Sequence, residues 1–137
     1  MQPFHLAIPV NSLEESAEFY EYILGATKGR SSSLWIDYNF FGHQLVCHLV
    51  KEKIEVVSNP VDDDDIPVPH FGVVLEWEDF DKLKEDLQAK NFNFYLKPKI
   101  RFAGKVGEQA TMFIKDPSNN AIEFKAFRDM GNLFSKD

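Results

Sequence analysis

Two halves of this chain carry the same order of predicted elements, at a spacing of about 65 residues. The clearest match sets Phe4-His-Leu-Ala-Ile8 against Pro69-His-Phe-Gly-Val73. In each half, a strand with alternating apolar residues is followed by a helix signal and then by three further strand-like runs. We therefore expect an α+β fold built from two tandem β-α-β-β-β modules.

The first module is expected from about residue 3 to residue 50. Phe4–Val10 alternates between apolar residues and a face that carries His5. Ser12 and Glu15 form a capping box, in which each satisfies a backbone donor at the start of a helix. Three strand-like runs follow this helix: Thr27–Arg30, Leu34–Asn39 and His43–Val50.

The second module is expected from about residue 69 to residue 128. Pro69–Trp77 is predicted as its first strand, with His70 on the face opposite the large apolar residues. Asp79 is the predicted N-cap of a helix that ends near Asn91. Three strand-like runs complete the module: Asn93–Ile100, Gln109–Lys115 and Ala121–Phe127.

Residues 51–68, rich in charge and proline, are expected to link the modules within one domain over residues 1–137. Asp62-Asp63-Asp64-Asp65 is interpreted as a solvated part of this linker. It lacks the spaced ligands and the central glycine of a calcium-binding loop.

A turn is predicted at Asp116-Pro117-Ser118-Asn119-Asn120, between the last two strands. Proline presets φ and asparagine accepts left-handed geometry, so this pentapeptide should reverse the chain tightly. Beyond the turn, Glu123 and Lys125 share one face of the last strand, and apolar residues share the other. Glu123 and Lys125 belong either to a solvated outer face or to a cleft.

Composition narrows the class of protein. A chain of 137 residues, 44% of them hydrophobic and 13 of them Phe, can bury one core and is not disordered. The net charge of −7 gives no electrostatic reason to expect nucleic acid or an anionic membrane as partner. The single cysteine, Cys47, excludes an intrachain disulfide and is expected to be a buried structural thiol. With no signal peptide and no run of membrane-spanning length, a cytoplasmic protein is expected.

His5 and His70 occupy equivalent positions in the two modules, each on a face that otherwise shows only a small residue, Ala7 or Gly72. A single histidine on a strand is usually structural or exposed. Two at equivalent positions, together with Glu123 on the last strand, indicate a ligand site. A sheet covered by helices on one side leaves its other side available for such a site.

These features resemble the vicinal oxygen chelate superfamily, which includes glyoxalase I, extradiol dioxygenases, fosfomycin-resistance enzymes and bleomycin-binding proteins. The resemblance is carried by His5, His70, the turn at 116–120 and Glu123, and it spans about residues 4–127. It implies a curved mixed sheet around a metal-containing cleft, with His5, His70 and Glu123 as ligands of one divalent ion. It also implies a small-molecule substrate and a homodimer.

Two imidazoles and one carboxylate leave coordination positions open on Fe²⁺ or Mn²⁺, which we favour, with Zn²⁺ and Ni²⁺ as alternatives. Gln44 and His48 lie on one face of the first module's closing strand and are the candidates for a catalytic role. Gln44 would act either as a fourth ligand of the ion or as a hydrogen-bond donor to one of the three ligands. His48 either lines the cleft or is a partly exposed strand residue. Arg101 and Lys125 are expected to hold an anionic group of a substrate, unless both are surface residues.

Two positions depart from the well-known relatives. Phe113 stands where extradiol dioxygenases place a tyrosine, so a proton donor beside the substrate is missing, although Phe113 should still line the substrate site. Gln44 stands where glyoxalase I places a catalytic carboxylate, and an amide cannot act as that base. We expect a dioxygenase of extradiol type on a small oxygenated substrate. The alternatives are a metal-dependent isomerase or lyase of glyoxalase type, and a small-molecule-binding resistance protein without catalysis.

Overall fold

The structure, a computed structural model, describes residues 2–136. The chain divides into two compact units. Unit 1 contains the residues up to Pro69 together with Asp116–Asn120, and unit 2 contains His70–Lys115 and the residues from Ala121 onward.

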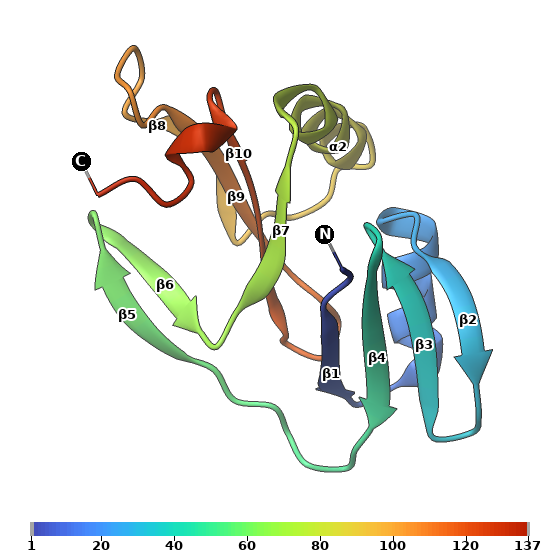
Figure 1. Cartoon of the computed structure of the whole chain (residues 1–137). Coiled ribbons are helices and arrows are strands. Elements are labelled where there is room, and N and C mark those ends of the chain that lie inside the picture. Colours follow the sequence, from blue (N-terminus) through green and yellow to red (C-terminus); the bar gives the residue numbers. More distant parts are fainter. Residues whose placement is uncertain (1, 137) are drawn as a thin grey trace. The chain divides into compact units, whose positions relative to one another are not determined.

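Unit 1 holds a four-stranded mixed sheet in the order β1-β4-β3-β2, with β1 parallel to β4 and the other pairs antiparallel (Figure 1). Its elements are β1 (His5–Val10), α1 (Leu13–Ala17), the π-helix η1 (Glu18–Ile23), β2 (Thr27–Ser31), β3 (Trp35–Phe40), β4 (His43–Leu49), β5 (Val57–Val61) and β6 (Asp64–Val68). Ser12 caps α1 by accepting a hydrogen bond from the Glu15 amide at 3.1 Å.

Unit 2 holds a second mixed sheet with the same topology, in the order β7-β10-β9-β8. Its elements are β7 (Phe71–Leu75), α2 (Trp77–Ala89), β8 (Leu96–Arg101), β9 (Gln109–Lys115), β10 (Ala121–Phe127) and the short 3-10 helix η2 (Met130–Asn132). The predicted pair of β-α-β-β-β modules is therefore confirmed.

Each sheet packs one face against its helix. In unit 2 the helix α2 lies along the sheet (Figure 1). The fully buried side chains there are Leu87 of α2 and Met112, Ile114, Ile122 and Phe124 of the sheet. Burying side chains of this size stabilises a fold by about 1.5–3 kcal/mol each. In unit 1 the corresponding face buries a cluster of four aromatic side chains: Phe19, Tyr20, Tyr38 and Phe40.

The region interpreted as a linker contains a hairpin that the sequence reasoning did not predict. Strands β5 and β6 pair only with each other in the sheet topology of the described residues. Asp62 and Asp63 form the two-residue turn between them, with φ of 48° and 69°. Two left-handed residues in succession give the turn whose twist matches a hairpin, and aspartate tolerates this geometry. The acidic run is thus a hairpin turn and the start of a strand.

Helix boundaries also differ from the predicted ones. The second helix begins at Trp77, which was assigned to the preceding strand, and its N-cap is Glu76. Asp79 lies inside the first turn, where a carboxylate is favourable beside the positive end of the helix dipole. In unit 1, the helix widens from α to π geometry at Glu18. None of the helices described over residues 2–136 is long and apolar enough to cross a membrane.

Candidate metal-ligand site

The face of the unit 2 sheet that lies opposite α2 carries the residues of interest. Glu123 and Lys125 alternate on β10 with residues buried beneath α2, so both lie on the opposite face. The register pairs Glu123 with Phe113 of β9 on one side and with Gly72 of β7 on the other. Thr111 is paired with Lys125 in the same way.

His70 and Glu123 meet on this face. The Nε2 atom of His70 lies 3.3 Å from Oε1 of Glu123, and the two side chains are 28% and 15% exposed. The other carboxylate oxygen of Glu123 accepts a hydrogen bond of 2.6 Å from the Thr111 hydroxyl. Lys125 Nζ lies 3.8 Å from that same oxygen. An imidazole and a carboxylate are thereby held together, 53 positions apart in the sequence.

The surroundings keep Glu123 ionised. Burial alone would raise the pKa of this carboxyl, but hydrogen bonds from His70 and Thr111 and the nearby charge of Lys125 outweigh it, and the net pKa is lowered. Glu123 therefore presents a negatively charged oxygen donor at neutral pH, as a divalent ion requires.

Phe113 fixes the ring of His70. The two rings pack edge to face, with centroids 5.1 Å apart and an interplanar angle of 74°. Phe113 is 2% exposed, so its position on β9 is set by the sheet. The aromatic ring thus orients the imidazole, and it adds no hydroxyl to the site.

Gly72 is required by the close approach of β7 to β10. A Cβ atom added to Gly72 would overlap the backbone carbonyl oxygen of Glu123. Gly72→Ala should therefore push the two strands apart, lower the free energy of unfolding by about 1–3 kcal/mol and separate His70 from Glu123. Urea unfolding measures this loss. Gly107→Ala is the matched control, because a Cβ added there meets nothing within 4 Å, and equal stability of the two variants would contradict the prediction.

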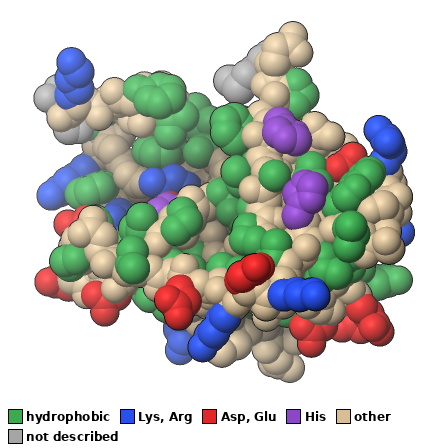
Figure 2. Space-filling model, turned by 90° about the horizontal axis from the view of Figure 1, so that it is seen from below, with side chains coloured by type: hydrophobic (Ala, Val, Ile, Leu, Met, Phe, Trp, Pro, Cys, Tyr) green, Lys and Arg blue, Asp and Glu red, His purple; other side chains and the backbone are tan. Residues whose placement is uncertain are grey.

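His5 lies in unit 1, at the start of β1, and is positioned by Gln44. The register pairs the two residues, and His5 Nδ1 lies 2.8 Å from Gln44 Oε1. The Gln44 side chain therefore contacts the Nδ1 edge of the His5 ring, which leaves Nε2 on the other side of the ring. Figure 2 shows histidine side chains at the molecular surface on the face seen from below.

The other two predicted residues, His48 in unit 1 and Arg101 in unit 2, lie apart from the pair in their own unit. His48 is exposed on β4 and pairs with Pro9, at the far end of β1 from His5. Arg101 is the last residue of β8 and pairs with Gln109. Within unit 1 the strand register does not bring His48 to His5, and within unit 2 it does not bring Arg101 to Glu123.

Cys47 is fully buried in β4. Burial, followed by the charge of Asp116, raises the pKa of its thiol to about 12. A thiol in this state is not a nucleophile at neutral pH, and its predicted structural role is in keeping with this.

No three His, Cys, Asp or Glu side chains among residues 2–136 gather into a group that could hold a metal ion. His70 and Glu123 belong to unit 2 and His5 to unit 1, so the ligand set is not assembled within either unit. The donors themselves fit a divalent ion: an ionised carboxylate held by Thr111, the adjacent imidazole of His70, and the imidazole of His5, whose Nδ1 contacts Gln44. The three-ligand set stays a prediction.

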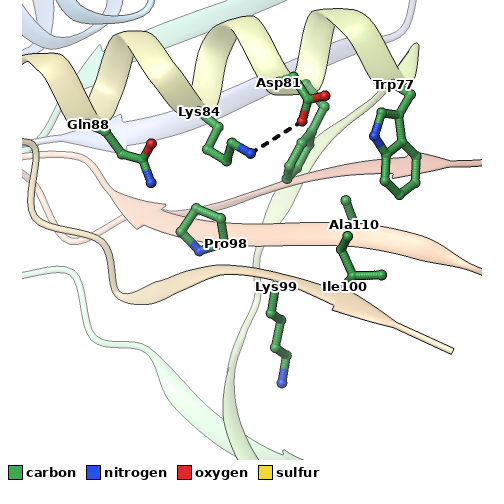
Figure 3. Close-up of a pocket in the computed structure, with 9 residues that line it drawn as sticks. Trp77, Asp81, Lys84, Gln88, Pro98, Lys99, Ile100 and Ala110 are labelled. Atoms are coloured by element: carbon green, nitrogen blue, oxygen red, sulfur yellow. Dashed lines mark ion pairs between the residues drawn. The ribbon is translucent and has the colours of Figure 1, made fainter. Parts of the chain in front are cut away.

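A cavity of about 390 Å³ lies on the helix-covered side of the unit 2 sheet, between α2 and β8 (Figure 3). Trp77 and Ile100 supply apolar walls, and Asp81 and Lys84 form an ion pair of 3.4 Å at its edge. Lys99 points away from α2 in Figure 3, in line with its pairing to Thr111 on the other face. This cavity is separated from Glu123 by the thickness of the sheet.

Sequence reasoning gave Thr111 no role, although this residue makes the shortest hydrogen bond to Glu123. A threonine in a strand is too common to attract attention. Its place two residues before Phe113, on the predicted cleft face, was the available signal.

Comparisons with known proteins agree with this topology. The family model of the Glyoxalase/Bleomycin resistance protein/Dioxygenase superfamily matches residues 2–124. A similar solved structure is a glyoxalase/bleomycin resistance protein/dioxygenase from Alicyclobacillus acidocaldarius, with 36% identity, a TM-score of 0.81 and coverage of 96% of both chains. A search of curated protein sequences gave no match.

More distant structures share the fold. The genomically encoded fosfomycin resistance protein FosX from Listeria monocytogenes has 18% identity and a TM-score of 0.68, with 92% of this chain and 93% of that chain covered. A lactoylglutathione lyase from Agrobacterium tumefaciens has 14% identity and a TM-score of 0.64, with 92% and 94% covered. These likenesses concern the fold alone.

Proposed function

The chain belongs to the glyoxalase/bleomycin resistance protein/dioxygenase superfamily, and we propose that it is a metal-dependent enzyme acting on a small oxygenated substrate. The observation that supports this most is the pairing of His70 with an ionised Glu123 on the sheet face of unit 2 opposite α2. In the proposal, His5, His70 and Glu123 hold one divalent ion, with Fe²⁺ or Mn²⁺ favoured over Zn²⁺ or Ni²⁺. Two imidazoles and one carboxylate leave positions open for substrate.

The chain's own residues prepare the donors. When bound, the ion supplies Lewis-acid and redox chemistry to substrate oxygens. Gln44 holds the His5 ring by the contact at Nδ1, and Thr111 holds Glu123 by its second oxygen. Phe113 fixes the ring of His70. Such supporting contacts raise metal affinity by about 10–100-fold.

An oxygen-dependent reaction of extradiol type is the first reaction that we propose. Phe113 lies against the ring of His70. A phenyl ring cannot take part in the proton transfer that catechol ring cleavage uses, so this contact favours a second candidate reaction. This second candidate is an isomerase or lyase of glyoxalase type, for which His5, His70 and Glu123 would hold an ion that supplies Lewis-acid chemistry.

Anaerobic purification followed by metal analysis tests the proposal. The protein should carry or take up about one divalent ion per chain, and the Fe²⁺ or Mn²⁺ form should consume oxygen with at least one member of a panel of catechols and 2-oxo compounds. Conversion of a 2-oxo substrate without oxygen uptake would support the isomerase or lyase. Failure to bind any divalent ion would leave a small-molecule-binding protein without catalysis.

A homodimer is part of the same proposal. Strands β1 and β7 each pair on one side only in the described sheets, and such edges are common sites of association. Light scattering on the same preparation should give the mass of two chains, and a monomer at micromolar concentration would contradict the dimer.

A further inference from the structure

A second cavity of unit 2, about 700 Å³ in volume, lies on the same sheet face as Glu123. Lys125 and Phe127, which follow Glu123 at alternate positions of β10, belong to its lining, as does Gln109, the register partner of Phe127. The volume falls in the range of about 300–1,000 Å³ that is typical of small-molecule sites. Because Lys125 Nζ lies 3.8 Å from Glu123, the cavity adjoins the candidate metal ligands.

The walls of this cavity are fastened to one another. One wall is the loop between β8 and β9, and the other is the segment that follows β10. Glu108 of the loop accepts hydrogen bonds from the Gly104 amide at 2.8 Å and from Arg128 Nε at 2.9 Å. Asn132 donates a side-chain hydrogen bond to the carbonyl of Val106.

The base of this second wall is also fixed. The guanidinium of Arg128 lies 3.5 Å from the centre of the Trp77 ring, a cation–π contact to the first residue of α2. The loop and the C-terminal segment therefore form a built enclosure on the sheet, in which both walls are tied to the same ion pair.

The chemistry of the lining is apolar and cationic. Phe102, Val106, Phe127 and Leu133 supply apolar surface, and Lys125 and Lys105 supply positive charge. Among the described residues that line the cavity, none is acidic, although the chain as a whole has a net charge of −7. A cationic enclosure in an acidic protein favours an anionic ligand.

The position of the cations sets how a ligand would lie. Lys125 is at the end nearest Glu123, and Lys99 lies on the same face through its pairing with Thr111. The apolar residues Phe102 and Val106 come from the loop, and Leu133 from the C-terminal segment. An anionic group would therefore lie beside Lys125 and an apolar group against the two walls.

We propose that this cavity is the substrate pocket for a small organic anion with an apolar body, held by Lys125 at its anionic end. This assignment rests on the proposed function, because it takes Glu123 to be the neighbouring metal ligand. It names the substrate class of that site: a compact aromatic or aliphatic acid.

Calorimetric titration of the full-length protein with 3-phenylpropionate and with its neutral amide tests the assignment. Both titrations are done without metal, in the presence of a chelator, and then with the metal-loaded protein. The acid should bind about tenfold more tightly than the amide even without metal, because a charge-assisted hydrogen bond to Lys125 is available only to the acid. Equal affinities of acid and amide would overturn the proposal.

Three variants sharpen the test. Lys125→Met should reduce the affinity for the acid to that for the amide, whereas Lys82→Met, on the exposed surface of α2, should change neither. Gly107→Leu should weaken both ligands, because Gly107 lines the cavity and has open space around an added Cβ. Unchanged acid binding in Lys125→Met would overturn the proposal, and Gly107→Leu tests the cavity without removing any existing side chain.

The two proposals fail in different ways. If the wild type binds no metal but still binds the acid through Lys125, the metal-dependent function fails and the pocket stands. If the acid binds only to the metal-loaded protein and independently of Lys125, the anion is held by the ion, and the pocket assignment is overturned.

Discussion

Replacing Glu123 with alanine is expected to lower divalent metal affinity by roughly 100-fold or more, because even the loss of a residue that only supports a ligand costs about 10–100-fold. Glu123 is the only predicted carboxylate ligand, and its ionised form neutralises part of the charge of the ion. Metal content after anaerobic reconstitution with Fe²⁺ or Mn²⁺, measured by elemental analysis, gives the result.

Three matched variants separate a metal site from a solvated sheet face. His5→Ala should lose metal as Glu123→Ala does, whereas Lys125→Ala should retain it. Thr111→Val keeps the shape of the side chain and removes only the 2.6 Å hydrogen bond to Glu123, so its loss of affinity should be smaller, about tenfold. Full metal occupancy in Glu123→Ala would show that the site is wrong.

Strand periodicity was sufficient to predict both sheets, because it is a local property of the sequence. The alternation in β10 placed Glu123 on the face opposite its apolar residues, and the structure has β9 and β10 at the predicted bounds. The repeat added what periodicity cannot give, since it made His70 equivalent to His5 before any contact was known.

The hairpin between Val57 and Val68 shows where local signals fail. Proline within a strand-like run and four consecutive aspartates both argue against a strand. The hairpin forms because Asp62 and Asp63 adopt left-handed conformations, which a run of identical residues does not indicate.

The cavity lined by Lys125 and Phe127 could not be predicted from the sequence, for a different reason. Its walls come from a loop and from the segment after the last strand, and neither has periodicity. The ties that hold them, between Glu108 and Arg128 and between Asn132 and Val106, join residues 20 and 26 positions apart. Contacts between residues this far apart in the sequence form only when the strands between them have folded into the sheet, so no local pattern predicts them.

Asp116→Ala is expected to lower the free energy of unfolding by about 3–5 kcal/mol, a large part of the 5–15 kcal/mol that stabilises an ordinary domain, because it leaves buried donors without an acceptor. Asp116 is 4% exposed. One of its oxygens accepts hydrogen bonds from the amides of Ser118 and Asn120 at 2.8 and 2.9 Å. The other accepts from the Tyr20 hydroxyl at 2.8 Å and from the Asn120 side chain at 2.9 Å.

The large effect follows from what the turn does in unit 1. The turn was predicted from Pro117 and the asparagines, and Asn119 has the expected left-handed φ of 74°. Its partners come from distant parts of the chain: Asn120 donates to the carbonyl of Pro9, and the Ser118 hydroxyl accepts from the Asn11 amide. The turn therefore fastens β1 within unit 1, and Asp116 holds the turn in shape.

Tyr20 is the partner whose loss isolates one part of this network. Burial, together with the charge of Asp116, raises the pKa of Tyr20 well above its ordinary value, so the hydroxyl stays protonated and donates to the carboxylate. Tyr20→Phe removes one donor to Asp116 and leaves three, and should lower the free energy of unfolding by about 1–2 kcal/mol.

Asp129→Ala is the matched control, because Asp129 is exposed and accepts only the Gly131 amide among the hydrogen bonds described for its side chain. Urea unfolding should rank the losses as Asp116→Ala, Tyr20→Phe and Asp129→Ala. If Asp116→Ala cost no more than Asp129→Ala, the turn would not be what holds β1 in unit 1.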